Sequence, residues 1–408
     1  MTSLFYNISE ALTLEGVVKK KGSKLLTSDL SLIKDASIVT EDGKILWVGE
    51  KANLPKDLEK SVQTRIDCKN KVVTPALIDS HTHLVFAGNR ANEFVMRLSG
   101  ASYEEIAHAG GGIKYSSQQT NQASSEELFN LAKDRLNQLY ELGVAACEIK
   151  TGYSLTLDGE INLLEIINKL KIYFASKIHI HRTLLSAHAT PPGVSADDYI
   201  ESVVLPSIEK AALNKLADSV DVFHEKNYFD EVHVAKIFNQ AKKFNLKIRI
   251  HADELNNNHG ALLASQHGCL SADHLLNTDS AGAKAMSDAG VIATLLPGTA
   301  FFLGKPLANA KMLLAQGCAV AIASDFNPGS SYINDVFHVA RMSTPTLGLN
   351  PAAFWSAISY NAARSLNLNS TGAIVIGFEA KLLCWDVSDS NELLYDWTRR
   401  PKCAHLKA

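Results

Sequence analysis

The sequence predicts an α/β protein: a (β/α)8 TIM-like barrel that carries a small β-sandwich domain built from both ends of the chain. Three observations favour this fold. Eight short β-rich runs follow one another between residues 72 and 324, amphipathic segments lie between them, and alternating runs occur at both ends of the chain. Eight β/α units that close on themselves form a barrel, whose active site lies at the C-terminal ends of its strands.

Both ends of the chain carry strand-like runs, and a Glu-Asp-Gly turn at 41–43 joins two of them as in a β-hairpin. These runs are residues 36–40, 44–49, 372–377 and 381–386. We therefore expect residues 1–71 and 370–408 to form one small composite domain. Residues 72–369 would then form the catalytic barrel.

The runs predicted as barrel strands are short and rich in β-branched and other apolar residues. They are residues 72–78, 144–149, 178–185, 220–224, 246–251, 271–275, 291–296 and 320–324. The amphipathic segments between them are long enough for crossover helices. The clearest are residues 126–142, 159–174, 196–216, 230–244 and 278–289.

Composition excludes several classes of function. The chain has 408 residues and a net charge of -3, which is too small to suggest nucleic acid or an anionic membrane as a partner. It contains no apolar stretch long enough to span a bilayer, and its N-terminus does not resemble a signal peptide, so we expect a cytoplasmic protein. Its 6 cysteines are widely scattered and form no Cys-x-x-Cys pair, which argues against both a disulfide framework and a thiolate zinc cage.

The phrase His81-Thr82-His83 follows the first predicted barrel strand. Side chains two residues apart on a strand point to the same face, so His81 and His83 can reach one cation while Thr82 faces away. Two histidines in a single His-x-His phrase more often make hydrogen bonds in the protein core than bind a metal. A metal site therefore needs further ligands elsewhere in the chain.

Three other predicted strands end in residues that bind metals or move protons. His251 ends the fifth run and Glu254 follows it, His274 lies in the sixth, and Asp325 follows the eighth. Histidines and a carboxylate around a divalent cation leave a position open for water, whose pKa the cation lowers towards about 7. Because these residues share the same rim of the barrel, the sequence predicts a hydrolytic metal site.

Two other features could bind a metal, but the sequence favours them less as ligands. His179 and His181 form a second His-x-His, but they lie at the start of their strand, away from the active rim, so packing or hydrogen bonding is the default. Lys150 could bridge two metals as a carbamate. An ion-pair or solvent role is favoured, because the fourth strand ends without a well-placed lysine, and one metal is the simpler interpretation.

These residues resemble the amidohydrolase superfamily, in its mononuclear branch with His-Ala-Asp-Glu after strand five. Several stretches are similar to one family within it, the imidazolonepropionases. They are residues 81–90, 102–106, 110–113, 148–153 and 187–189. The resemblance extends across essentially the whole barrel, and it implies a barrel of the metal-dependent hydrolase type.

The resemblance also implies a reaction, the hydrolysis of 4-imidazolone-5-propanoate to N-formimidoyl-L-glutamate, the third step of histidine degradation. The small-molecule substrate would be hydrolysed with one zinc or iron ion per subunit. Carried over position by position, the metal ligands would be His81, His83, His251 and Asp325.

Further residues match positions that hold the substrate in that family. Arg90 offers a planar fork suited to the propanoate carboxylate. The other matching positions are Tyr153, His188, Asn327, Gly329 and Ser330. For catalysis we expect Asp325 or His274 to help deprotonate the water, His274 to stabilise the oxyanion, and Glu254 to contact the ring and pass a proton to the departing nitrogen.

Two other classes of function stay open at this point. A deaminase of the same superfamily, acting on a nitrogen heterocycle, would use the same metal ligands, and only the surroundings of Arg90 and Tyr153 speak against it. A barrel kept as a non-catalytic scaffold is the second alternative, which the intact ligands disfavour. A homodimer is expected from the family and from the prevalence of two-fold oligomers.

Overall fold

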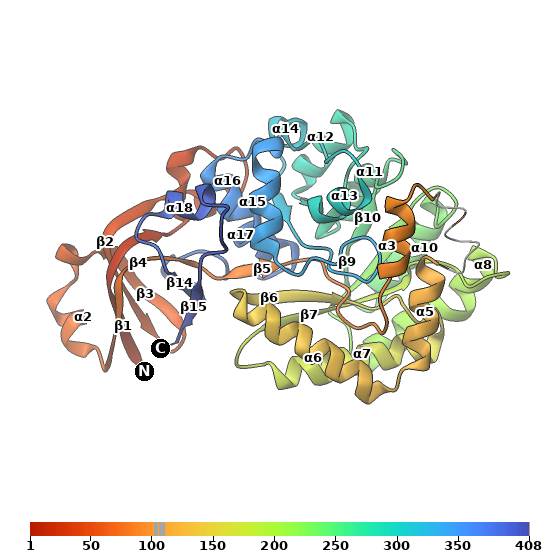
Figure 1. The fold of residues 1–408 in the computed structure, drawn as a ribbon, viewed down its shortest axis with the longest axis horizontal. Helices are drawn as coiled ribbons and strands as arrows, with labels where there is room; N and C mark the ends of the chain where they lie inside the picture. The colour runs from red at the N-terminus through yellow and green to blue at the C-terminus, as the bar shows by residue number, and fades with distance from the viewer. Residues whose placement is uncertain (102–104, 106–110, 408) are drawn as a thin grey trace.

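A computed structural model describes residues 1–101, 105 and 111–407. Figure 1 shows a barrel of strands surrounded by helices, with a separate sheet at one side that contains both ends of the chain. The predicted fold class is confirmed. Residues 102–104, 106–110 and 408 lie outside the described part. They include most of the stretch 102–106 and the first residue of the stretch 110–113, both of which carry the family resemblance.

The barrel strands pair in parallel in the order β5-β6-β7-β8-β10-β11-β12-β13, and β9 also pairs with β8. β9 and β10 together form the fifth barrel strand, interrupted at Arg249. The bounds are β5 (Leu77–Asp79), β6 (Val144–Lys150), β7 (His179–Ala187), β8 (Ser219–His224), β9 (Lys247–Ile248), β10 (Ile250–Ala252), β11 (Ser271–His274), β12 (Ile292–Leu295) and β13 (Val320–Ile322). Every residue of β6 is buried, as expected for a strand covered on both faces.

The chain closes the barrel between β5 and β13 through residues next to the predicted site. The backbone N–H of Asp325 donates to the carbonyl of His81 at 3.0 Å. Just before these residues in the chain, the carboxylate of Asp79 accepts hydrogen bonds from the backbone N–H (3.0 Å) and the hydroxyl (2.6 Å) of Ser324. The closure therefore fixes His81 and Asp325 relative to each other.

The ends of the chain form a separate sheet with the order β15-β14-β4-β1-β2-β3. Its strands are β1 (Thr2–Leu12), β2 (Leu32–Glu41), β3 (Lys44–Glu50), β4 (Thr64–Pro75), β14 (Leu382–Trp385) and β15 (Cys403–Leu406). The predicted turn between β2 and β3 is present, with positive φ at Asp42 (49°) and Gly43 (77°). The domain limits at 71 and 370 stay a prediction.

Two predicted strands differ from the structure. The run 72–78 is divided between two strands, because β4 continues in the terminal sheet to Pro75 and β5 begins the barrel at Leu77. Residues 372–377 do not form a strand. The N–H of Ile374 bonds to Thr13 and that of Gly377 to Ile45, so no continuous ladder can form.

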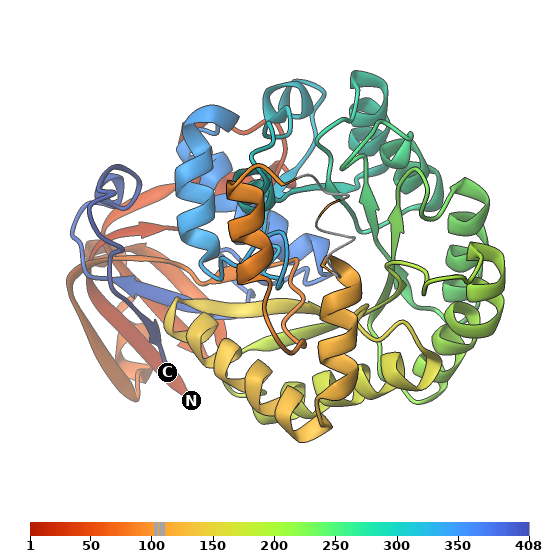
Figure 2. The same ribbon diagram turned by 45° about the vertical axis from the view of Figure 1, so that its right-hand side comes forward.

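The predicted crossover helices are present around the barrel (Figure 2). They include α6 (Ser125–Glu141), α7 (Leu157–Tyr173), α8 (Ala196–Tyr199), α9 (Leu205–Leu213), α10 (Glu231–Lys243), α11 (Gly260–His267), α12 (Ser280–Ala289), α14 (Ala310–Ala315), α15 (Val336–Leu347), α16 (Pro351–Ala357) and α17 (Tyr360–Ser365). The loops after β5 and β12 carry α3 (Ala91–Leu98), α5 (Ile113–Gln122) and α13 (Pro297–Leu303), and the terminal segments carry α1 (Glu15–Lys19), α2 (Lys56–Ser61) and α18 (Ser390–Tyr395). Within the described ranges, none of the helices has the length and apolar character needed to cross a membrane.

Candidate metal centre

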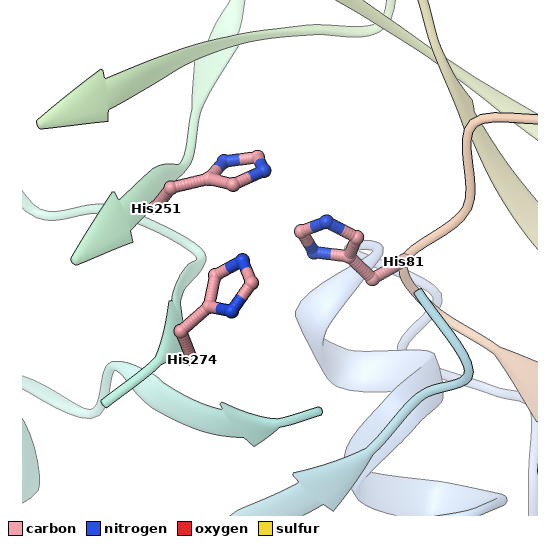
Figure 3. A group of neighbouring side chains, drawn as sticks. All are labelled: His81, His251 and His274. Carbon is pink, nitrogen blue, oxygen red and sulfur yellow. The ribbon is translucent and has the colours of Figure 1, made fainter. Parts of the chain in front are cut away.

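Three imidazoles from three barrel strands converge at the C-terminal end of the barrel (Figure 3). His81 follows β5, His251 lies in β10, and His274 ends β11. The ring centroids are 4.6 Å apart for His81 and His251, 5.2 Å for His251 and His274, and 5.7 Å for His81 and His274. Each residue has a ring nitrogen within 4.8 Å of those of the others, so the group could hold one cation.

His83 and Asp325 extend the group around His81. The Oδ1 atom of Asp325 lies 3.5 Å from Nε2 of His81 and 3.5 Å from Nε2 of His83. Asp325 has a φ of 51°, a left-handed turn that directs its side chain into the barrel mouth. The hydroxyl of Thr299 donates to its other oxygen at 2.5 Å. The structure thus brings the four predicted ligands and His274 around one space.

The protonation of these residues suits a transition metal. Burial lowers the pKa of His81, His83 and His274 well below the usual imidazole value, which leaves them neutral with a free lone pair. At His251 burial acts in the same direction, but the charge of Asp221 outweighs it and the pKa is raised. Nε2 of His81 is buried without a hydrogen-bond partner among the described residues, as expected for an atom that ligates a metal. The residues therefore fit a divalent ion with imidazole and carboxylate ligands.

Five fully buried charged residues lie next to the imidazoles, and we call them the inner charge cluster: Glu148, Lys150, Asp221, Arg249 and Asp273. The ammonium of Lys150 lies 2.6 Å from Oδ2 of Asp221 and 2.9 Å from Oε1 of Glu148. The predicted ion-pair role of Lys150 is confirmed. Because its amine is engaged by two carboxylates, it is not arranged as a bridge between metals.

Two carboxylates of the inner charge cluster contact the metal-facing imidazoles. Oδ2 of Asp273 lies 2.7 Å from Nδ1 of His81 and accepts a hydrogen bond from Arg249 at 3.0 Å. Oδ2 of Asp221 lies 3.1 Å from Nδ1 of His251. Burial alone would raise the pKa of Asp273, but Arg249 and His81 outweigh it and hold that pKa well below its usual range. Such carboxylates orient metal-binding imidazoles and fix which ring nitrogen is free.

Glu254 and Asp325 form a pair of carboxyl groups with different protonation. Oε2 of Glu254 lies 3.6 Å from Nε2 of His274, and 14% of the Glu254 side chain is exposed. Burial and the charge of Asp325 raise the pKa of Glu254 to about 8, whereas burial raises that of Asp325 to about 6. Near neutral pH one group keeps its proton and the other is largely ionised, which suits general acid and base chemistry.

Two predicted substrate residues lie beside the metal-facing rings. The ring of His188 is stacked on His83 with centroids 5.4 Å apart, and the ring of Tyr153 lies 5.7 Å from His83 and 5.5 Å from His188. Nδ1 of His188 lies 3.0 Å from the carbonyl oxygen of Gly152. Because a carbonyl accepts, the neutral ring carries its proton on Nδ1. Nε2 of His188 is then left as an acceptor.

Arg90 is fixed at the start of α3. Its Nε donates to the hydroxyl of Ser116 in α5 at 2.9 Å, and its Nη1 lies 3.8 Å from Glu93. The guanidinium packs against Gly329, where a Cβ atom would lie 2.2 Å from Nη1. The fork of Arg90 therefore lies against the loop that follows Asp325.

That loop is organised by the side chain of Asn327. Its Oδ1 accepts from the backbone N–H groups of Gly329 (2.8 Å) and Ser330 (2.7 Å), and its Nδ2 donates to the carbonyl of Asp325 (2.7 Å) and to the Ser330 hydroxyl (2.9 Å). Asn327 thus holds the loop in shape. Its assignment, and those of Gly329 and Ser330, as substrate-binding residues stay predictions.

The rival pair His179 and His181 lies elsewhere. His179 is exposed at the first position of β7, and a ring nitrogen of buried His181 lies 2.9 Å from the hydroxyl of Ser219. Within the described ranges, neither residue belongs to a group of side chains that could hold a metal.

Sequence reasoning assigned no role to Asp221, Arg249 or Asp273. One signal in the sequence could have found them: each is a charged residue inside a predicted barrel strand. A charge buried in such a strand almost always has a partner. Each of the three residues lies within a run predicted as a barrel strand. Their partners come from other strands, so the pairing itself could not be found from one sequence.

The fold and the metal-facing group define the chain as an amidohydrolase, and the model of the Amidohydrolase family matches residues 72–405. Two curated proteins named imidazolonepropionase, from Mesorhizobium japonicum and Rhizobium meliloti, are each 40% identical to it. The first alignment covers 92% of both chains, and the second covers 90% of this chain and 88% of the relative. The chain therefore belongs to the imidazolonepropionase family of amidohydrolases.

Solved structures share the fold at low sequence identity. An atrazine chlorohydrolase mutant from Arthrobacter aurescens, complexed with zinc, has a TM-score of 0.73 at 14% identity, and the comparison covers 96% of this chain and 91% of that one. A 5-methylcytosine deaminase from Klebsiella pneumoniae has a TM-score of 0.71 at 17% identity, covering 98% and 95%. These similarities support the architecture alone.

Proposed function

We propose that this chain hydrolyses the ring amide of 4-imidazolone-5-propanoate to N-formimidoyl-L-glutamate in histidine degradation. Relatives with that enzyme name, 40% identical over most of the chain, support the proposal. The structural observation that carries it is the position of Arg90. Its fork lies against Gly329, on the loop after metal-facing Asp325, where it could hold the substrate carboxylate while the ring reaches the imidazoles.

We further propose His81, His83, His251 and Asp325 as ligands of one zinc or iron ion per subunit. When bound, such an ion would lower the pKa of a water molecule and polarise the substrate carbonyl. Asp273 and Asp221 would keep the ligating imidazoles in orientation through their contacts with His81 and His251.

Different residues would accept and donate the protons that move during the reaction. Water attacks the ring carbonyl carbon, and its proton passes to Asp325 or His274. His274 also donates a hydrogen bond to the carbonyl oxygen as negative charge develops there. Glu254, next to His274, gives its proton to the ring nitrogen as the carbon–nitrogen bond breaks, in keeping with its raised pKa of about 8. The ring opens, and the single product carries both the amidine and the new carboxylate.

The proposed substrate contacts place the carboxylate at Arg90 and the ring between the aromatic side chains and the loop after β13. Besides Arg90 and Glu254, the residues that would hold the substrate are Tyr153, His188, Asn327, Gly329 and Ser330. A homodimer in the cytoplasm and the division at residues 71 and 370 belong to the same proposal.

The direct test mixes purified, metal-loaded protein with freshly generated imidazolone propanoate and follows the loss of its ultraviolet absorbance. Hydrolysis without release of ammonia supports the proposal. Lack of turnover, with ammonia released instead from candidate heterocyclic bases, would identify a deaminase. The deaminase hypothesis is not favoured, because the relatives that are 40% identical to this chain are named imidazolonepropionase. A metal analysis that finds no cation would favour the scaffold hypothesis.

A further inference from the structure

Arg97 reaches the same loop as Arg90 from the same helix. The two residues are seven positions apart, which is two helical turns, so they lie on one side of α3. Nη2 of Arg97 donates to the carbonyl of Gly329 at 3.0 Å, whereas Arg90 packs against the α-carbon of that glycine. One glycine therefore joins both arginines to the loop after β13.

The guanidinium of Arg97 is held beside two aromatic rings. Its central carbon lies 5.7 Å from the ring centroid of Phe94 and 5.6 Å from that of Phe302, and the two rings are 4.4 Å apart. Its Nε is buried without a hydrogen-bond partner among the described residues. A methionine or leucine would fill this space without that unpaired donor, so packing alone does not account for an arginine here.

Other contacts join the start of α3 to α5. Oε2 of Glu93 accepts from the backbone N–H of Gly112 at 2.8 Å, and the hydroxyl of Ser116 accepts from Nε of Arg90 at 2.9 Å. Ser116 lies in α5 and Gly112 is the N-cap residue of that helix, and α3 and α5 are neighbours in Figures 1 and 2. The free end of the Arg90 fork is thus held between α5 and the Gly329 loop.

We propose that Arg97 is a positioning residue that sets where the Arg90 fork lies relative to the metal centre, and thereby selects substrates whose carboxylate is at the distance of the propanoate. This inference rests on the proposed function. Loss of the bond to Gly329 would let the loop and α3 move apart, so Arg90 would no longer meet the carboxylate while the ring lies at the imidazoles. The ring chemistry depends on other residues.

The experiment compares two substrates: imidazolone propanoate, and the same imidazolone ring with a methyl group in place of the propanoate. In Arg97→Met, we expect the preference for the propanoate, as the ratio of the two kcat/KM values, to fall about tenfold, since one charge-assisted hydrogen bond is lost. The fall should arise mainly from a higher KM for the propanoate. Arg97→Lys, which keeps the charge and can reach the Gly329 carbonyl, should restore most of the preference.

Arg364→Met is the matched control, because Arg364 is also partly buried, donates to a backbone carbonyl (Lys21) and lies 5.9 Å from an aromatic ring (Tyr360). Arg364→Met should prefer the propanoate over the methyl compound as strongly as the unaltered chain does. An unchanged preference in Arg97→Met, or an equal loss of kcat/KM on both substrates, would overturn the inference. Failure of the unaltered chain to hydrolyse the propanoate would instead overturn the proposed function.

Discussion

Asp273 and His81 share a fully buried hydrogen bond of 2.7 Å between Oδ2 and Nδ1, on the side of the ring away from Asp325. Because a carboxylate oxygen accepts, Nδ1 of His81 carries the proton and Nε2 has the free lone pair. Arg249 donates to the same oxygen of Asp273 and keeps it ionised. The orientation of a predicted metal ligand is thus set by residues on two other strands.

The first prediction concerns Asp273→Asn, which keeps the shape of the side chain and removes its charge. We expect affinity for zinc to fall about 10- to 100-fold, because His81 loses the partner that fixes its tautomer. Competition with a chromophoric chelator measures this affinity. Asp218→Asn is the control, since Asp218 also pairs with an arginine, Arg182, but lies directly before β8 at the opposite end of the barrel. Equal losses in both variants would contradict the role given to Asp273.

The second prediction concerns Lys150→Met, which leaves Glu148 and Asp221 buried without their shared cation. Removing one member of a buried ion pair costs about 3–5 kcal/mol, so the free energy of unfolding should fall by roughly that amount. Urea denaturation of the metal-free protein measures it. Lys284→Met removes an exposed pair with Asp288 and should change stability by less than about 1 kcal/mol. A fall of less than about 1 kcal/mol in Lys150→Met would contradict the prediction.

The barrel could be predicted from the sequence because the period and length of its strands are local properties. The residues that face the metal site could also be predicted, because a parallel barrel brings the C-terminal ends of all its strands to one rim. The prediction failed at residues 372–377, where the backbone N–H groups bond to separate segments instead of one neighbouring strand. The inner charge cluster could not be predicted, since most of its contacts join different strands, and which cation meets which carboxylate depends on the register of those strands.

The third prediction concerns the proton transfers. Glu254→Gln and His274→Asn should each lower kcat about 10²- to 10⁴-fold, the usual contribution of a positioned acid or base. Steady-state kinetics on metal-loaded protein measure the effect, and metal content is determined for each variant. Either residue is excluded from catalysis if its variant retains both its metal and a near-normal kcat.

The fourth prediction uses the raised pKa of Glu254, which is about 8 against an ordinary value of 4.5. Between these values the folded chain holds a proton that the unfolded chain has lost, so Glu254 lowers stability as pH rises through this window. A glutamine at this position does not titrate. In metal-free protein, the stability of Glu254→Gln relative to the unaltered chain should therefore increase from about pH 5 to about pH 8. Urea midpoints at several pH values test this, and a constant difference would contradict it.

The fifth prediction concerns Gly329→Ala, which places a methyl group where the Arg90 guanidinium lies. The added Cβ would be 2.2 Å from Nη1 and 2.3 Å from the central carbon of Arg90, so the fork must move away from the loop. We expect KM for imidazolone propanoate to rise about tenfold while kcat changes less, because the carboxylate contact is lost and the metal-facing residues stay in place. Gly304→Ala is the control: Gly304 ends α13 with a φ of 64° and open space around it, so alanine there should cost stability through its backbone alone. If Gly304→Ala raised KM as much as Gly329→Ala, the rise would reflect general loosening of the fold rather than displacement of Arg90.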